Sequence, residues 1–109
     1  MKNKTNLRPL NRNIFIPTSF SPNADGNNDL FYAFSNNPSI RRINTFRIAD
    51  RWGNLHFYAS DCLISSPDCG WDGTFNGQPA QPGVYAYKIE IEFIDGERLY
   101  KRGDVTLLR

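Results

Sequence analysis

The chain has 109 residues and a mass of 12.5 kDa, which is the usual size of one domain and too short for two ordinary ones. Hydrophobic residues make up 39% of the chain and charged residues only 22%, a composition that argues against global disorder. No apolar run approaches the roughly 20 residues of a membrane-spanning helix. The formal net charge is +2, but four basic residues and no acidic ones lie within the first twelve positions. The remaining nine basic and eleven acidic residues make the rest of the chain mildly acidic, so we expect no nucleic-acid partner.

Residues 1–12 are polar and basic, with no hydrophobic periodicity, and we interpret them as a disordered linker or a vector-derived arm. This segment lacks the apolar core of a secretory signal peptide. We therefore expect a fragment of a longer protein, with its single domain spanning residues 13–109.

Short apolar segments alternate with turns throughout this domain. Strand character is found at 13–17, 30–35, 40–51, 55–59, 84–94 and 97–108. In the clearest strand, 84–94, Tyr85, Ile89 and Phe93 share an apolar face, and charged residues occupy the other. Asp95-Gly96 predicts a two-residue type I′ hairpin, and Gly103 predicts a β-bulge in the return strand. The expected fold is all-β: an immunoglobulin-like antiparallel β-sandwich of about seven short strands.

Cys62 and Cys69 are the two cysteines of the chain. A disulfide between them would close a small loop and indicate an oxidising compartment outside the cytoplasm. Free thiols are a second interpretation. A zinc site is a third and weaker one, because His56 is the single histidine.

Oxygen-bearing side chains recur at every second position in the loop after the first strand, at Asn23, Asp25, Asn27 and Asp29. In a curled loop, such side chains can turn inward and form part of a calcium shell. The alternative is a cluster of Asx turns, in which the side chains bond their own backbone.

Two tryptophans lie in turns and invite a recognition role. Arg51 and Trp52 would form an exposed pair for a partner, or Trp52 would plug the core between two strands, which we favour. Trp71 would be a stacking platform for a carbohydrate, or it would cap the end of the sandwich, which we also favour. Catalysis has little support, because His56 has no nucleophile motif near it and is expected at a solvent-facing strand position.

The order of motifs along the chain resembles one family throughout. The segments that carry this resemblance are FIPTSFSPNADGNNDLF, FRIADRWGNLHFYAS, WDGTFNGQPAQPGVYAYKIEI and DGERLYKRGDVTLLR. Together they resemble the gliding-motility-associated C-terminal domain, the type B sorting domain of the type IX secretion system. The likeness runs from Ile14 to Arg109. The chain departs from the family at Ala24, where glycine is common, and in its cysteine pair, which only some members have.

The resemblance implies a non-catalytic C-terminal secretion signal on a large surface adhesin or secreted protein. Such a protein would cross the periplasm and end at the cell surface or in the medium. The implied partners are a PorP/SprF-like outer-membrane protein and the type IX translocon. A chain that ends on a patterned strand agrees with a terminal signal. The residues expected to contact the partner are Arg51, Trp52, Asp104, Val105, Thr106, Leu107, Leu108 and Arg109. The alternative is an immunoglobulin-like adhesive module that binds glycan or protein.

Overall fold

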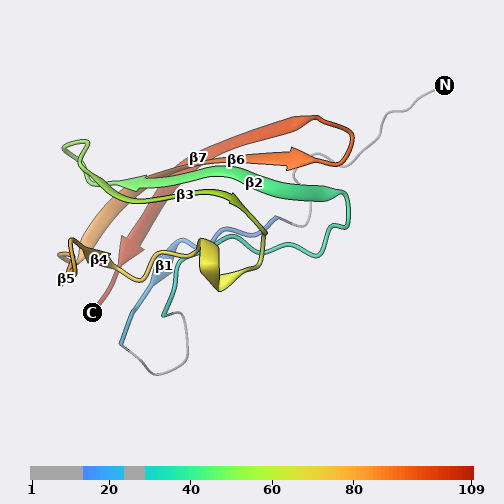
Figure 1. The fold of residues 1–109 in the computed structure, drawn as a ribbon. Coiled ribbons are helices and arrows are strands. Elements are labelled where there is room, and N and C mark those ends of the chain that lie inside the picture. The colour runs from blue at the N-terminus through green and yellow to red at the C-terminus, as the bar shows by residue number, and fades with distance from the viewer. Residues whose placement is uncertain (1–13, 24–28) are drawn as a thin grey trace.

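The computed structural model describes residues 14–23 and 29–109. This part of the chain is almost entirely β-structure, which confirms the expected fold class (Figure 1). Its helical element is the single 3-10 turn η2, Pro67–Cys69. The strands are β1 (Ser19–Phe20), β2 (Ile40–Ala49), β3 (Leu55–Cys62), β4 (Thr74–Phe75), β5 (Gln78–Pro79), β6 (Gly83–Phe93) and β7 (Arg98–Leu107).

Five strands form one sheet in the order β1-β7-β6-β2-β3, and β4 and β5 form a small hairpin beside it. The four long strands are antiparallel to one another where they pair. β1, however, runs parallel to β7 through the pairs Ser19↔Thr106 and Phe20↔Leu107, so the expectation of a wholly antiparallel sheet is wrong at this edge. β1 and β7 are far apart in the sequence, and no hairpin turn forces them into opposite directions.

The second layer of the sandwich consists of extended segments rather than regular strands. Figure 1 shows these segments running below the main sheet, on the side of η2. Two isolated bridges, Phe15↔Phe34 and Phe31↔Trp71, connect them. Within the described residues, the strand expected at 13–17 is reduced to one bridged residue, Phe15, and the strand expected at 30–35 to two, Phe31 and Phe34. Each bridge supplies only two backbone hydrogen bonds, of 2.8–2.9 Å.

Aromatic side chains fill the space between the two layers. The Trp71 ring packs against Phe20 and Tyr85, with ring centroids 5.4 and 5.0 Å apart. Phe31, from the second layer, contacts Phe46 of β2 at 5.7 Å. No polar or charged residue is buried among the described residues, so this core is held by apolar burial and ring packing.

The expected inward face of the long hairpin is confirmed. Tyr85, Ile89 and Phe93 of β6 are buried, as are Val105 and Leu107 of β7. The register between β6 and β7 is unbroken from Gly83↔Leu107 to Glu92↔Arg98.

The turn of this hairpin differs from the expected type I′ turn. In the turn, only Gly96 has a positive φ, of 91°. The Gly96 N–H donates to the Phe93 carbonyl at 2.9 Å, and the Phe93 N–H donates to the Glu97 carbonyl at 2.8 Å. This is a three-residue loop with glycine at its left-handed position. Positive φ at both central residues is found instead at Asn76 and Gly77, which join β4 to β5.

The β-bulge expected at Gly103 is also wrong, because the β6–β7 register has no shift there. The glycine is explained by a close approach of its cross-strand partner, Tyr87. A Cβ atom at Gly103 would lie 2.8 Å from the Tyr87 Oη and 3.0 Å from its Cζ. The Tyr87 ring itself contacts Phe31 at 5.6 Å and therefore has little room to move aside.

We predict that Gly103→Ala destabilises the domain by about 1–3 kcal/mol, because the new methyl group overpacks this site. Urea denaturation measures the change in the free energy of unfolding. The matched control is the same substitution in a Tyr87→Ala background, where the clash is removed and the cost should shrink. Equal costs in the two backgrounds would show that Tyr87 does not impose the glycine.

Candidate functional site

The β2–β3 turn is organised by the carboxylate of Asp50. Its Oδ1 accepts the backbone N–H groups of Trp52 and Asn54, both at 2.9 Å. Its Oδ2 accepts the Asn54 side-chain amide at 3.0 Å and lies 3.1 Å from Nε2 of His56. Four donors therefore converge on one carboxylate and fix the turn that presents Arg51 and Trp52.

This environment changes the acidity of Asp50. Desolvation of the carboxylate acts to raise its pKa, but the hydrogen bonds from Asn54, His56 and Trp52 together outweigh it and lower the pKa of Asp50 from 3.8 to about 2. The same charge acts on Tyr85. Burial first, and then the Asp50 carboxylate, raise the pKa of the Tyr85 hydroxyl above its usual value, and that hydroxyl donates to the Gln81 carbonyl at 2.6 Å.

His56 is not at a solvent-facing position, contrary to the sequence expectation. Its side chain is 8% exposed. It stacks on Phe75 of β4 at 4.2 Å and contacts the edge of Tyr85 at 5.1 Å. The β4–β5 hairpin covers this end of β3, and a pattern of alternating residues cannot reveal such a cover. Because an ionised carboxylate only accepts, Nε2 of His56 donates to Asp50. The other ring nitrogen, Nδ1, is buried and has no partner.

Trp52 lies on the surface, so the favoured interpretation of this residue as a core plug is wrong. It is 78% exposed, and the Arg51 guanidinium lies 5.4 Å from its ring centroid. Four hydrogen bonds to Asp50 order the turn while leaving the side chains of Arg51 and Trp52 accessible.

Trp71, in contrast to Trp52, lies in the core. It is 1% exposed and its Nε1 donates to the Thr74 carbonyl at 2.9 Å, so it cannot be a platform for carbohydrate.

The six terminal residues expected to contact a partner differ in their exposure and in their roles. Val105 and Leu107 are fully buried, so their side chains belong to the core. Asp104 and Leu108 are exposed, and Thr106 is half-buried. Arg109 has a structural role, because one of its terminal nitrogens donates to the carbonyls of Gly73 and Ala80, at 2.8 and 3.0 Å. The terminal arginine thereby ties the end of β7 to the base of the β4–β5 hairpin.

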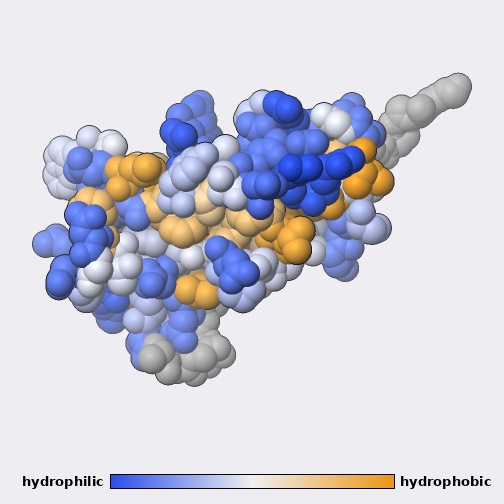
Figure 2. All heavy atoms as spheres, viewed as in Figure 1, coloured by the Kyte–Doolittle hydropathy of each residue, from blue (hydrophilic) through white to orange (hydrophobic). Residues whose placement is uncertain are grey.

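The structure brings the β2–β3 turn and the last strand to the same end of the sheet. Gly53 of the turn and Asp104 of β7 line one groove, of about 680 Å³, on the face that points away from the core. Ala49 and Ala86 pair across β2 and β6 between them, and their small side chains leave the hollow. Figure 2 shows hydrophobic patches on the surface beside strongly hydrophilic residues near the β6–β7 hairpin end.

Two further candidate sites were expected from the sequence, the cysteine pair and the calcium loop. Cys62 and Cys69 form a disulfide, which excludes the free-thiol and zinc interpretations. The bond joins the end of β3 to η2 and is worth about 2–3 kcal/mol in the chain-entropy account. Asp25 and Asn27 of the expected calcium loop lie outside the described residues, so calcium stays a prediction. The two other residues of this loop, Asn23 and Asp29, are hydrogen-bonded: the Asn23 backbone N–H donates to Asp29 Oδ1 at 3.1 Å.

We predict a loss of thermal stability as the pH falls from 3.8 toward 2, because in this range the unfolded chain binds a proton at Asp50 while the folded chain still holds the carboxylate ionised. The sign follows from the depressed pKa: the stabilisation is complete above pH 3.8 and is lost as the pH passes through the folded value. Asp50→Asn should lower the melting temperature at pH 7 and flatten its dependence on pH in this window. A variant curve parallel to that of the wild type would contradict this role of Asp50.

Comparison with known proteins identifies the domain as a whole. A search of curated proteins gave no significant match. No helix in the described part of the chain has the length and apolar character needed to cross a membrane. The family model of the CHU_C type IX secretion signal domain matches residues 14–107, which include both layers of the sandwich. The chain therefore belongs to the CHU_C family of type IX secretion signal domains.

Proposed function

We propose that this domain is the non-catalytic sorting signal of a larger cell-surface or secreted protein. In this proposal, a PorP/SprF-like outer-membrane protein recognises the folded domain after it has crossed the periplasm, and the type IX translocon then exports it with its passenger. The observation that carries the proposal is the family match over residues 14–107, because it includes every strand of the fold. The signal is thus a folded surface, not a short linear peptide.

The disulfide supports passage through an oxidising compartment. Cys62 and Cys69 are seven positions apart, and their bond fixes η2 against β3. Disulfides persist outside the cytoplasm and are rare within it. A domain that folds and oxidises in the periplasm would present a rigid surface to an outer-membrane partner.

The surroundings of His56 support a non-catalytic role. The Asp50–His56 pair resembles the acid–base part of a hydrolase triad, but neither ring nitrogen is available to a substrate. Nε2 is bonded to Asp50, and Nδ1 is buried. General acid–base catalysis requires a titratable group within reach of the substrate. We infer that the pair stabilises the β2–β3 turn.

We predict that the domain is sufficient to export a foreign passenger. A fluorescent protein with an N-terminal signal peptide and this chain at its C-terminus should reach the cell surface or the medium of a host with the type IX system and the cognate partner. The same fusion should stay in the periplasm when the partner gene is deleted. Fractionation with immunoblotting measures both.

Retention of the fusion in the periplasm when partner and translocon are both present would contradict the proposal. Export that continues without the PorP/SprF-like protein would show that another component recognises the domain. Specific binding of the isolated domain to a glycan array, without export, would favour the adhesive alternative, in which the exposed Trp52 would be the contact residue.

A further inference from the structure

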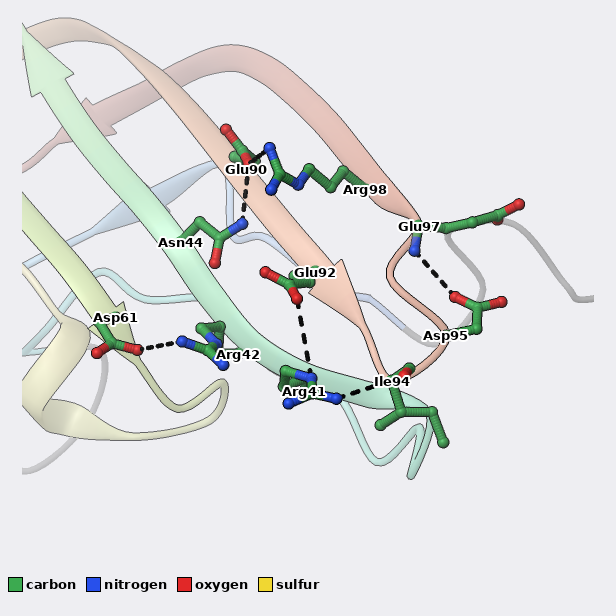
Figure 3. Close-up of polar contacts among 10 residues, drawn as sticks. All are labelled: Arg41, Arg42, Asn44, Asp61, Glu90, Glu92, Ile94, Asp95, Glu97 and Arg98. Carbon is green, nitrogen blue, oxygen red and sulfur yellow. Dashed lines mark hydrogen bonds and ion pairs between the residues drawn. The ribbon is translucent and has the colours of Figure 1, made fainter.

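The outer face of the main sheet carries charge in two contrasting arrangements. Near the β6–β7 hairpin, each arginine has an acidic partner (Figure 3). Arg98 pairs with Glu90 at 3.5 Å, Arg41 with Glu92 at 3.8 Å, and Arg42 with Asp61 at 3.0 Å. This half of the face is therefore balanced within the domain.

Midway along the same face, three cations form a row without acidic partners. Arg47 of β2 is opposite Lys88 of β6, and Lys88 is opposite Arg102 of β7. All three are exposed, and in the described part of the chain none has an ion-pair partner within 4.0 Å. Like charges at directly opposed positions of a sheet repel one another. Such a row gains no stability from ion pairs within the described residues and is complementary to a negatively charged partner.

The row crosses the groove described above. Arg47, Lys88 and Arg102 line both this groove and a second one, of about 580 Å³, which continues toward Tyr100. Apolar groups border the row: Leu55 is 48% exposed and Tyr100 is 67% exposed. Tyr58 is exposed beside Arg47, whose guanidinium lies 5.3 Å from its ring centroid. Arginine with exposed aromatic residues is the composition typical of protein-binding hot spots.

We propose that this row, Arg47–Lys88–Arg102, is the docking surface for an extended acidic segment of the outer-membrane partner. The inference rests on the proposed function and adds to it the surface and the chemistry of recognition. With strands about 4.8 Å apart, the row spans about 10 Å, and carboxylates on alternate residues of an extended chain are about 7 Å apart. Two acidic side chains of one segment therefore fit over the three cations, and the backbone of the segment runs beside the groove floor at Ala49 and Ala86.

The contrast between the two halves of the face provides a matched control. Replacing Arg47, Lys88 and Arg102 by Gln removes three positive charges from the row, and replacing Arg41, Arg42 and Arg98 by Gln removes three from the paired half. In the export assay, the first variant should lower the exported fraction of the fusion by about tenfold, as expected for loss of a charged contact surface, and the second should leave it within about twofold of wild type.

A direct binding measurement uses a synthetic peptide of alternating Thr and Glu as the probe, with alternating Thr and Gln as its control. Titration into the isolated chain should shift the backbone amide resonances of Arg47, Lys88 and Arg102. The row variant should weaken binding by about tenfold. The paired-half variant should not.

A further variant leaves Arg47, Lys88 and Arg102 in place, so that its result does not depend on how their replacement affects folding. Ala86→Glu places a carboxylate in the floor of the groove and should reduce export and peptide binding, whereas Ala86→Gln should reduce neither.

If the wild-type fusion is not exported, the proposed function fails. If it is exported and both the row variant and Ala86→Glu are exported equally well, the docking surface is wrong and the proposed function stands. Binding of the row to phosphatidylglycerol vesicles but not to the acidic peptide would also overturn the proposal.

Discussion

The fold depends on the aromatic contact between its two layers. The main sheet holds itself together through three long antiparallel ladders, whereas the described segments of the second layer are joined to one another by isolated bridges. What keeps that layer in place is burial of its large side chains, above all Trp71 and Phe31, against β2 and β6. A fully buried aromatic side chain contributes several kcal/mol. The total stability of such a domain is only about 5–15 kcal/mol.

Because the aromatic contacts between the layers occupy the inner face of the main sheet, the inner face is structural and the outer face is available for recognition. The inner face of the sheet is used completely by the core, and the terminal residue Arg109 clamps the β4–β5 hairpin beside it. Within residues 14–23 and 29–109, no second layer packs on the outer face, and charged and aromatic side chains such as Arg47 and Tyr100 are exposed there. Asp50 connects the two halves, because it bonds to the His56 side chain, which is 8% exposed, and also orders the exposed turn of Trp52. This arrangement of the described residues suits the proposed recognition of the folded domain by a partner.

Alternation along the chain was enough to predict the long strands and their buried faces, because β6 and β7 have one face in the core and one in solvent. The same reasoning failed at His56 and Trp52, since the first is covered by a distant hairpin and the second is held outward by a turn. The sequence does not reveal why glycine is needed at position 103, because the cause is Tyr87 on the neighbouring strand and only the register brings the two together. Asn76-Gly77 is also a sequence signal for a type I′ turn, and the two positive φ angles lie there and not at Asp95-Gly96.

The cation row had a partial signal in the sequence. Lys88 falls on the polar face of its strand, but Arg47 and Arg102 join it only through the pairing of β2 and β7 with β6. Family resemblance indicates the function class, and the strand pairing is what carries the proposed docking surface. Neither could have supplied the other, because a motif order specifies no register and a register specifies no biological role.

The most direct test of this account compares the two tryptophans by urea denaturation. Trp71→Ala should lower the free energy of unfolding by about 3–5 kcal/mol and remove the hydrogen-exchange protection of the Phe31 amide, because the tie between the layers is lost. Trp52→Ala should change the free energy of unfolding by less than about 0.5 kcal/mol, as expected for an exposed side chain. A loss at Trp71 no larger than the loss at Trp52 would contradict the claim that aromatic packing between the layers holds the fold together.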